Sequence, residues 1–259
     1  MGPQVHSGQH PAPDRLTRFT DRAGDYAAHR PSYPPGAIDA IVGERRPASL
    51  VAADVGAGTG ISSRLLADRG VRVHAIEPNA AMRAAAEPHH LITWHDGTGE
   101  ATGLPGSSVD LVLAAQAFHW FDPVAAIDEF RRVLRPPMAR IALMWNVHDQ
   151  ADPIMQAYRS AIIDHATDPP QSPWFKDPGR PLVKARGLSH ARVMTVPNVH
   201  AVSRDGLIGR ALSASYAPKS GPAHDAMVRD LHALFDRFAH GPLLTMRYIT
   251  EVHLAEVIP

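Results

Sequence analysis

The sequence predicts a doubly wound α/β fold, in which helices cover both faces of a mostly parallel sheet. Short apolar runs alternate with stretches of helical spacing along most of the chain, as in β–α–β units. A glycine-rich loop at residues 56–60 follows the first apolar run, and the second run ends on Glu77. In doubly wound folds a glycine loop and an acid in these two places hold a nucleoside. Five such units and a terminal hairpin predict a seven-stranded sheet with an antiparallel last strand.

The first unit begins with residues 50–55, which are mostly apolar and lack a helical period. This pattern is typical of a strand buried on both faces. Helical spacing at 61–69 ends at Gly70, and residues 71–76 alternate as a second strand. Glycines in the intervening loop permit positive φ angles and a close approach of the backbone to a ligand. Glu77 is placed to accept hydrogen bonds from both hydroxyls of a ribose.

The spacing of the loop glycines indicates which nucleoside would bind. A dinucleotide fingerprint reads G-x-G-x-x-G, but here Gly60 comes one position early and Ile61 stands where the fingerprint has Gly or Ala. Asp54, just before the loop, would repel a pyrophosphate and attract an amino group. The pattern D-x-G-x-G-x-G resembles motif I of the class I S-adenosylmethionine (SAM)-dependent methyltransferases, which implies a Rossmann-like fold and SAM as cofactor. A nicotinamide-dependent reductase and a glycine-rich turn without a ligand are the alternatives.

Composition argues against several classes of function. The chain has 26 Lys and Arg against 26 Asp and Glu, so its net charge favours neither nucleic acid nor a membrane surface. It has no cysteine, which removes disulfides and thiolate metal sites. No apolar run approaches the ~20 residues of a membrane span, and the N-terminal stretch lacks the apolar core of a secretory signal, so we expect a cytoplasmic protein. His89 and His90 are adjacent and His95 lies past a strand, so we expect no metal site among the 16 histidines.

The residues before the first strand divide into a tail and a helical preamble. Residues 1–18 are polar and rich in proline, and we expect them to be a disordered tail. Residues 19–33 have the pattern of a short helix that ends at Arg30, before a proline. This preamble is similar to the segment before motif I in many small-molecule methyltransferases, where an N-terminal helix closes over the cofactor. The resemblance implies that Tyr26 and Arg30 approach the methionyl end of SAM, since an aromatic face favours a sulfonium and a guanidinium pairs with a carboxylate. An ordinary amphipathic helix is the alternative.

Two further strands are expected to end beside the cofactor. After a third strand at 91–94, the same resemblance implies that Asp96, Gly97 and Thr98 meet the adenine, with a plain polar turn as the alternative. A fourth strand at 109–115 ends on the run Q-A-F-H-W-F. This run resembles a signature of the methyltransferase type 11 group, which includes trans-aconitate methyltransferase-like enzymes.

His119 within this run is the candidate catalytic base, because its side chain has a suitable pKa range at the right strand end. A pocket-lining or hydrogen-bonding role is the alternative, since the resembling enzymes include ones that methylate carboxylates, where the acceptor is already an anion. The tryptophans Trp120, Trp145 and Trp174 are the candidate substrate-binding residues, with simple packing as the alternative.

The rest of the chain completes the expected fold. Helices are predicted at 36–42, directly after Asn79, and at 124–134, 153–166, 203–215 and 221–240, and strands at 141–145, 191–202 and 243–257. Asn146 is expected to end the fifth strand. The catalytic domain is expected to span residues 19–259, and the resemblance to the methyltransferases implies a helical cap inserted at about 147–190.

The predicted function is SAM-dependent transfer of a methyl group to a small-molecule acceptor, at a carboxylate or hydroxyl oxygen. A non-catalytic SAM-binding protein is the main alternative, because methyl transfer has no obligatory catalytic residue. The expected cofactor-binding residues are Tyr26, Arg30, Asp54, Gly56, Ala57, Gly58, Gly60, Glu77, Pro78, Met82, Asp96, Gly97, Thr98, Gln116 and Ala117.

Overall fold

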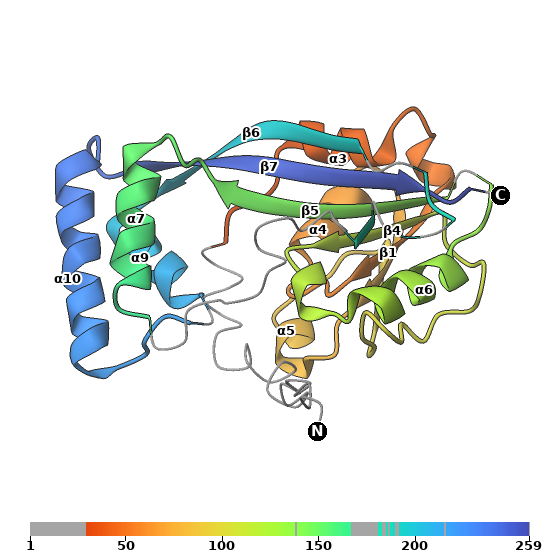
Figure 1. Ribbon diagram of the computed structural model, residues 1–259, viewed down its shortest axis with the longest axis horizontal. Helices are drawn as coiled ribbons and strands as arrows, with labels where there is room; N and C mark the ends of the chain where they lie inside the picture. Colours follow the sequence, from red (N-terminus) through yellow and green to blue (C-terminus); the bar gives the residue numbers. More distant parts are fainter. Residues whose placement is uncertain are drawn as a thin grey trace, which may run out of the picture.

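The computed structural model describes residues 30–137, 139–166, 181–182, 185, 187–189, 192–214 and 216–258. Within them, one sheet has the strand order β3-β2-β1-β4-β5-β7-β6 (Figure 1). The strands are β1 (Val51–Val55), β2 (Arg72–Ile76), β3 (Ile92–His95), β4 (Leu111–Ala115), β5 (Arg140–His148), β6 (Arg192–Val202) and β7 (Leu244–Glu256). Neighbouring strands are parallel except that β7 is antiparallel to both β5 and β6. The predicted fold is confirmed.

Helices pack on both faces of the first strands. Consecutive residues of a strand point to opposite faces, so Ala52 joins one hydrophobic core and Ala53 the other. The core around Ala52 includes residues of two helices, and the core around Ala53 includes residues of a third. The helices of the first core are α3 (Pro35–Val42) and α4 (Ile61–Ala67), and the helix of the second core is α6 (Pro123–Val133). A short helix, α5 (Ala80–Ala84), follows β2 and begins at Asn79, whose side chain accepts hydrogen bonds from two backbone amides of the first turn.

A third hydrophobic core belongs to the cap. Its helices are α7 (Pro153–Ile163), α9 (Arg204–Leu212) and α10 (Gly221–Phe238). They stand together at one end of the long strands β5, β6 and β7, at the left of Figure 1. Tyr158 of α7 and Tyr248 of β7 are fully buried members of this core. The cap is predicted only at about 147–190, whereas α9 and α10 come from the connection between β6 and β7.

Strand β5 is longer than the sequence predicts. The prediction that Asn146 ends the strand is wrong, because the strand continues to His148 along a nine-residue pairing with β7. The side-chain oxygen of Asn146 accepts hydrogen bonds from Thr250 Oγ1 at 2.6 Å and from Asn198 Nδ2 at 3.1 Å. Asn146 therefore links the three C-terminal strands of the sheet.

Several predictions concern residues outside the described part of the chain. These are the tail at 1–18, most of the preamble including Tyr26, and Trp174. Among the described residues, no helix has both the length and the apolar character needed to cross a membrane. The same residues contain no group of three His, Cys, Asp or Glu side chains arranged to hold a metal ion.

Candidate functional site

The glycine loop between β1 and α4 has the conformation that its sequence requires. Gly56, Gly58 and Gly60 have φ angles of 70°, 58° and 79°, a region that other residues rarely adopt. A Cβ atom at Gly56 would lie 2.5 Å from the Cβ of Ala117, and one at Gly60 would lie 3.0 Å from the ring of Trp94. At Gly56 and Gly60 both the backbone conformation and the available space therefore exclude a side chain.

Glu77 joins the glycine loop to the end of β2. Its Oε2 accepts a hydrogen bond from the backbone N–H of Gly58 at 2.9 Å, and its Oε1 accepts one from the N–H of Asn79 at 2.9 Å. The side chain is buried, and burial raises the pKa of the carboxyl group against the opposing effect of these two amides. Each carboxylate oxygen can accept a second hydrogen bond. Glu77 is thus able to receive two hydroxyl groups of a ribose without releasing the loop.

Asp54 faces helix α4. Its Oδ2 accepts hydrogen bonds from Ser62 Oγ at 2.7 Å and Ser63 Oγ at 2.6 Å, and within the described residues its Oδ1 has no hydrogen-bond partner. Complete burial raises the pKa of Asp54 to about 6, although the two serine hydroxyls oppose the shift. The observed contacts anchor the first turn of α4 to β1, and a direct contact between Asp54 and a cofactor amino group stays a prediction.

The loop after β3 lies beside Glu77. Asp96 is exposed, with its carboxylate 3.5 Å from Arg83 Nη2, and its negative charge raises the pKa of Glu77. Thr98 closes a turn by donating its N–H to Ala101 O at 3.0 Å and accepting the N–H of Ala101 at 3.2 Å. Space is tight at Gly97, where a Cβ atom would lie 2.8 Å from a backbone oxygen. The three predicted adenine contacts therefore follow one another at the same sheet edge as Glu77.

The other predicted cofactor contacts lie at the ends of β2 and β4. Pro78 is partly buried after β2, and Met82 of α5 is buried with 4% of its surface exposed. Gln116 follows β4 with a φ angle of 54° and donates its side-chain amide to Asn146 O at 3.0 Å. Ala57, in the glycine loop, donates its N–H to the carbonyl oxygen that ends β2, at 3.0 Å. These polar and small groups thus lie at the carboxyl ends of β2, β1 and β4, which are neighbouring strands of the sheet.

His119 is held as a neutral imidazole. The indole N–H of Trp145 points to His119 Nδ1 at 3.4 Å. Burial, with a smaller contribution from the charge of Arg30, lowers the pKa of His119 to about 3. An imidazole with this pKa is a weak base at neutral pH. Trp145 is itself buried, while Trp120 is partly exposed with its ring centroid 4.9 Å from that of His119. The catalytic and substrate-binding roles of these three residues stay predictions.

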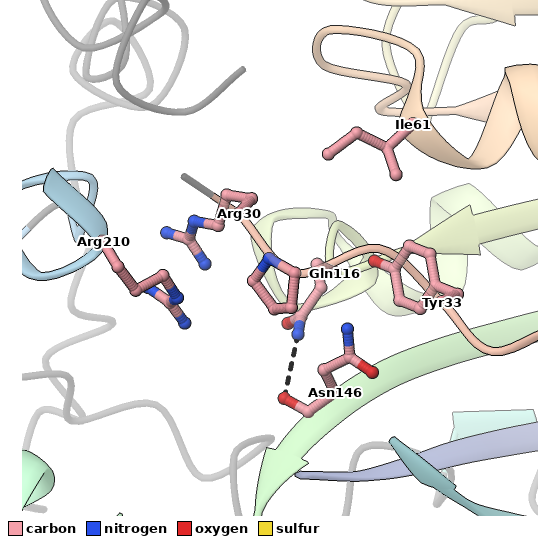
Figure 2. Close-up of a pocket in the computed structure, with 7 residues that line it drawn as sticks. Arg30, Tyr33, Ile61, Gln116, Asn146 and Arg210 are labelled. Atoms are coloured by element: carbon pink, nitrogen blue, oxygen red, sulfur yellow. Dashed lines mark hydrogen bonds between the residues drawn. The ribbon is translucent and has the colours of Figure 1, made fainter. Parts of the chain in front are cut away.

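A small cavity of about 10 Å³ lies where the strand ends meet the cap (Figure 2). It is lined by Arg30, Pro31, Tyr33, Ile61, Gln116, Asn146 and Arg210. Arg30 reaches the cap by donating from Nη2 to Ser213 O at 3.1 Å. The structure therefore brings together Arg30 and Gln116, two of the predicted cofactor-binding residues. Arg210 of α9 lines the same cavity and is not among the predicted residues.

Comparison with known proteins shows where this chain belongs. Residues 53–137 match the family described as "Methyltransferase domain". A methyltransferase-like protein of Schizosaccharomyces pombe is 30% identical over 194 residues, which cover 71% of this chain and 75% of that protein. The chain belongs to the methyltransferase family. An uncharacterized methyltransferase of Mycobacterium tuberculosis is 42% identical over 140 residues, and this chain spans 55% of its length.

Solved structures place the chain among Rossmann-like folds. A structure described as a type II methyltransferase from Anaeromyxobacter dehalogenans has a TM-score of 0.66 at 28% identity, covering 89% of this chain and 99% of that one. A phosphoethanolamine N-methyltransferase of Haemonchus contortus, in complex with phosphomonomethylethanolamine and S-adenosylhomocysteine, has a TM-score of 0.56 at 14% identity. It covers 97% of this chain and 61% of that one. At this low identity the second likeness shows the fold alone.

Five of the seven residues that line the cavity are not among the site residues predicted from the sequence: Pro31, Tyr33, Ile61, Asn146 and Arg210. The sequence pattern predicts Asn146 only as the end of a strand. The sequence does contain a signal for Arg210, since this residue shares the buried face of α9 with Leu207 and Ala211. An arginine three residues after a leucine, on the apolar face of a helix, is unusual unless its charge interacts with a partner or a ligand.

Asp54 gives this methyltransferase a pH-dependent stability. The pKa of its carboxyl group is about 6 in the folded chain, against an ordinary value of 3.8. The folded state therefore holds the proton at a higher pH than the unfolded state, and folding stability falls as the pH rises through this interval, by about 3 kcal/mol in total. Between about pH 4.5 and pH 7.5, wild type should lose about 2 kcal/mol more stability than Asp54→Asn, measured by urea denaturation. Equal pH dependence of the two proteins would refute this assignment.

Proposed function

We propose that this methyltransferase transfers a methyl group from SAM to the carboxylate or hydroxyl oxygen of a small molecule. One observation carries the cofactor assignment: the buried carboxylate of Glu77 holds the backbone of a glycine loop in which Gly56 and Gly60 leave no room for a side chain. A nucleoside lying against this loop would place its ribose hydroxyls at Glu77. Membership of the methyltransferase family supports the same cofactor.

Three parts of SAM, the ribose, the methionyl carboxylate and the adenine, have candidate partners among the described residues. Glu77 would bind the ribose, and the guanidinium of Arg30 would bind the methionyl carboxylate together with the amide of Gln116. Around the adenine we expect Pro78, Met82, Asp96, Gly97, Thr98 and Ala117. The loop residues Gly56, Ala57, Gly58 and Gly60 would lie along the nucleoside and the methionyl chain.

SAM supplies an activated methyl group when it is bound, so the protein chiefly has to orient the acceptor and exclude water. A neutral His119 suits this task as a hydrogen-bonding group that lines the pocket. A carboxylate acceptor is already ionised at neutral pH and needs no base. The low pKa of His119 therefore favours an acidic acceptor over an alcohol, in line with the resemblance to trans-aconitate methyltransferase-like enzymes.

Calorimetric titration of the purified protein with SAM, S-adenosylhomocysteine and NADH tests the cofactor. We expect micromolar binding of the first two ligands and no heat with NADH. Binding of NADH alone would refute the proposal and reassign the glycine loop to a dinucleotide.

Incubation with SAM carrying a labelled methyl group and a fractionated metabolite extract tests the acceptor. We expect label in molecules that pass a small-pore filter, and label retained with protein or RNA would contradict a small-molecule acceptor. SAM binding without label in any fraction would indicate the non-catalytic SAM-binding protein.

A further inference from the structure

Arg210 is a buried cation with no counter-charge among the described residues. Only 8% of its surface is exposed, and its Nε has no hydrogen-bond partner among the described residues. Its Nη1 lies 3.4 Å from Ser213 Oγ, which is a long hydrogen bond to a neutral group. No carboxylate in the described part of the chain forms an ion pair with it within 4.0 Å. An unpaired charge in such a place reduces folding stability, so its presence calls for a ligand.

The groups around Arg210 are phenols and an imidazole. Burial lowers the pKa of the Arg210 guanidinium, but nearby Tyr158, Tyr248 and Tyr216, together with a hydrogen bond to Tyr248, more than offset this effect and raise the pKa, so the guanidinium stays protonated. The hydroxyl of Tyr158 is buried and has no hydrogen-bond partner within the described residues. Burial and the nearby arginines lower the pKa of His148 to about 3. The cluster therefore offers hydrogen-bond donors and one positive charge, and its titratable members include no carboxylate.

Arg30 lines the same cavity, but its guanidinium lies beside a partial negative charge. It donates to the carbonyl oxygen of Ser213, just beyond the last turn of α9, where the helix dipole gives a partial negative charge. In Figure 2, Arg30 lies between Arg210 on the cap side and Ile61 on the side of the glycine loop. The carboxylate of one bound SAM would be matched by Arg30, the nearer of the two to that loop. Arg210 would remain for a second anion.

We propose that Arg210 binds an oxyanion of the methyl acceptor, a carboxylate or a phosphate ester, and so selects acidic small molecules as substrates. This inference rests on the proposed function. A guanidinium group binds two oxygens of such an anion side by side through its parallel N–H donors. In this arrangement the carboxyl ends of the strands bind the cofactor and the cap binds the acceptor. The cavity lies between these two parts.

Anion binding to the SAH-loaded protein (SAH, S-adenosylhomocysteine) tests the proposal, because SAH occupies the site for the cofactor's own carboxylate. Glutarate, citrate and glycerol 3-phosphate are titrated by calorimetry, with glutaramide and glycerol as uncharged counterparts. We expect at least one anion to bind wild type and its uncharged counterpart not to bind. The preferred probe distinguishes a carboxylate site from a phosphate site.

Four variants separate the role of Arg210 from general effects of charge. Arg210→Gln should weaken the bound anion at least tenfold while SAH affinity stays within twofold, and Arg210→Lys should lose less. Arg159→Gln removes an exposed arginine of the same cap and should leave anion binding unchanged. Because it removes an unpaired buried charge, Arg210→Met should melt at or above the temperature of wild type.

The experiment distinguishes failure of the proposal for Arg210 from failure of the proposed function. The proposal is overturned if no anion binds wild type, if Arg210→Gln binds the anion as wild type does, or if Arg210→Gln loses SAH affinity tenfold. The last result would assign Arg210 to the cofactor. If wild type does not bind SAH, the proposed function fails, and titration of the same anions without SAH still decides whether Arg210 binds them.

Discussion

Replacing Glu77 by alanine is expected to weaken binding of SAM and S-adenosylhomocysteine by at least ~100-fold. A hydrogen bond to a charged acceptor contributes about 1.5–3 kcal/mol, so the loss of two ribose bonds costs about 3 kcal/mol or more. The variant also removes the two acceptors that hold the N–H groups of Gly58 and Asn79. The loop is then no longer joined to β2 through this side chain, so the ligand-free binding site is less ordered. Calorimetric titration measures the effect.

Two variants serve as controls for Glu77→Ala. Glu77→Gln keeps one acceptor oxygen and the shape of the side chain, so we expect a smaller loss. Glu87→Ala removes a carboxylate that is 79% exposed and is paired with Arg64 at 3.6 Å, and it should bind SAM as wild type does. A folded Glu77→Ala protein with wild-type affinity for SAM would exclude Glu77 from the cofactor site.

Gly56→Ala is expected to destabilise the protein by about 2–5 kcal/mol and to abolish cofactor binding. The added Cβ would lie 2.5 Å from the Cβ of Ala117 and 3.2 Å from the ring of Phe121. It would also be held at a φ angle of +70°, which alone costs about 1–2 kcal/mol. The loop can avoid the overlap only by moving away from β4, which moves the backbone that the nucleoside would contact. Urea denaturation and titration with SAM measure the two effects.

Gly103→Ala separates the two contributions. Gly103 has a φ angle of +74° but nothing within 4 Å of an added Cβ, so its variant should show only the conformational cost. A double variant, Gly56→Ala with Ala117→Gly, removes the atom that the new methyl group meets and should recover part of the lost stability. If Gly56→Ala is no less stable than Gly103→Ala, close packing against Ala117 is not what requires glycine here.

Local patterns in the sequence determined the core of the fold. An apolar run without helical period predicted a strand at 50–55, and the structure has β1 at Val51–Val55. The glycine loop, the following helix and the acid after β2 all lie where they were predicted. These features depend on neighbouring residues in the chain: the steric freedom of glycine, the period of a helix and the alternation of a strand. The same local pattern identified Glu77, whose position follows from the length of one β–α–β unit.

Tertiary structure alone decided the features that depend on residues distant in the chain. β5 extends to His148 because β7 pairs with it across about a hundred residues of sequence. The low pKa of His119 results from burial beside Trp145, which no spacing in the sequence predicts. Arg210 lines the same cavity as Arg30 only because the end of α9 lies beside Arg30, which donates a hydrogen bond to Ser213 O. Burial and charge at a point are sums over all surrounding segments, so these properties exist only once the sheet and the cap have come together.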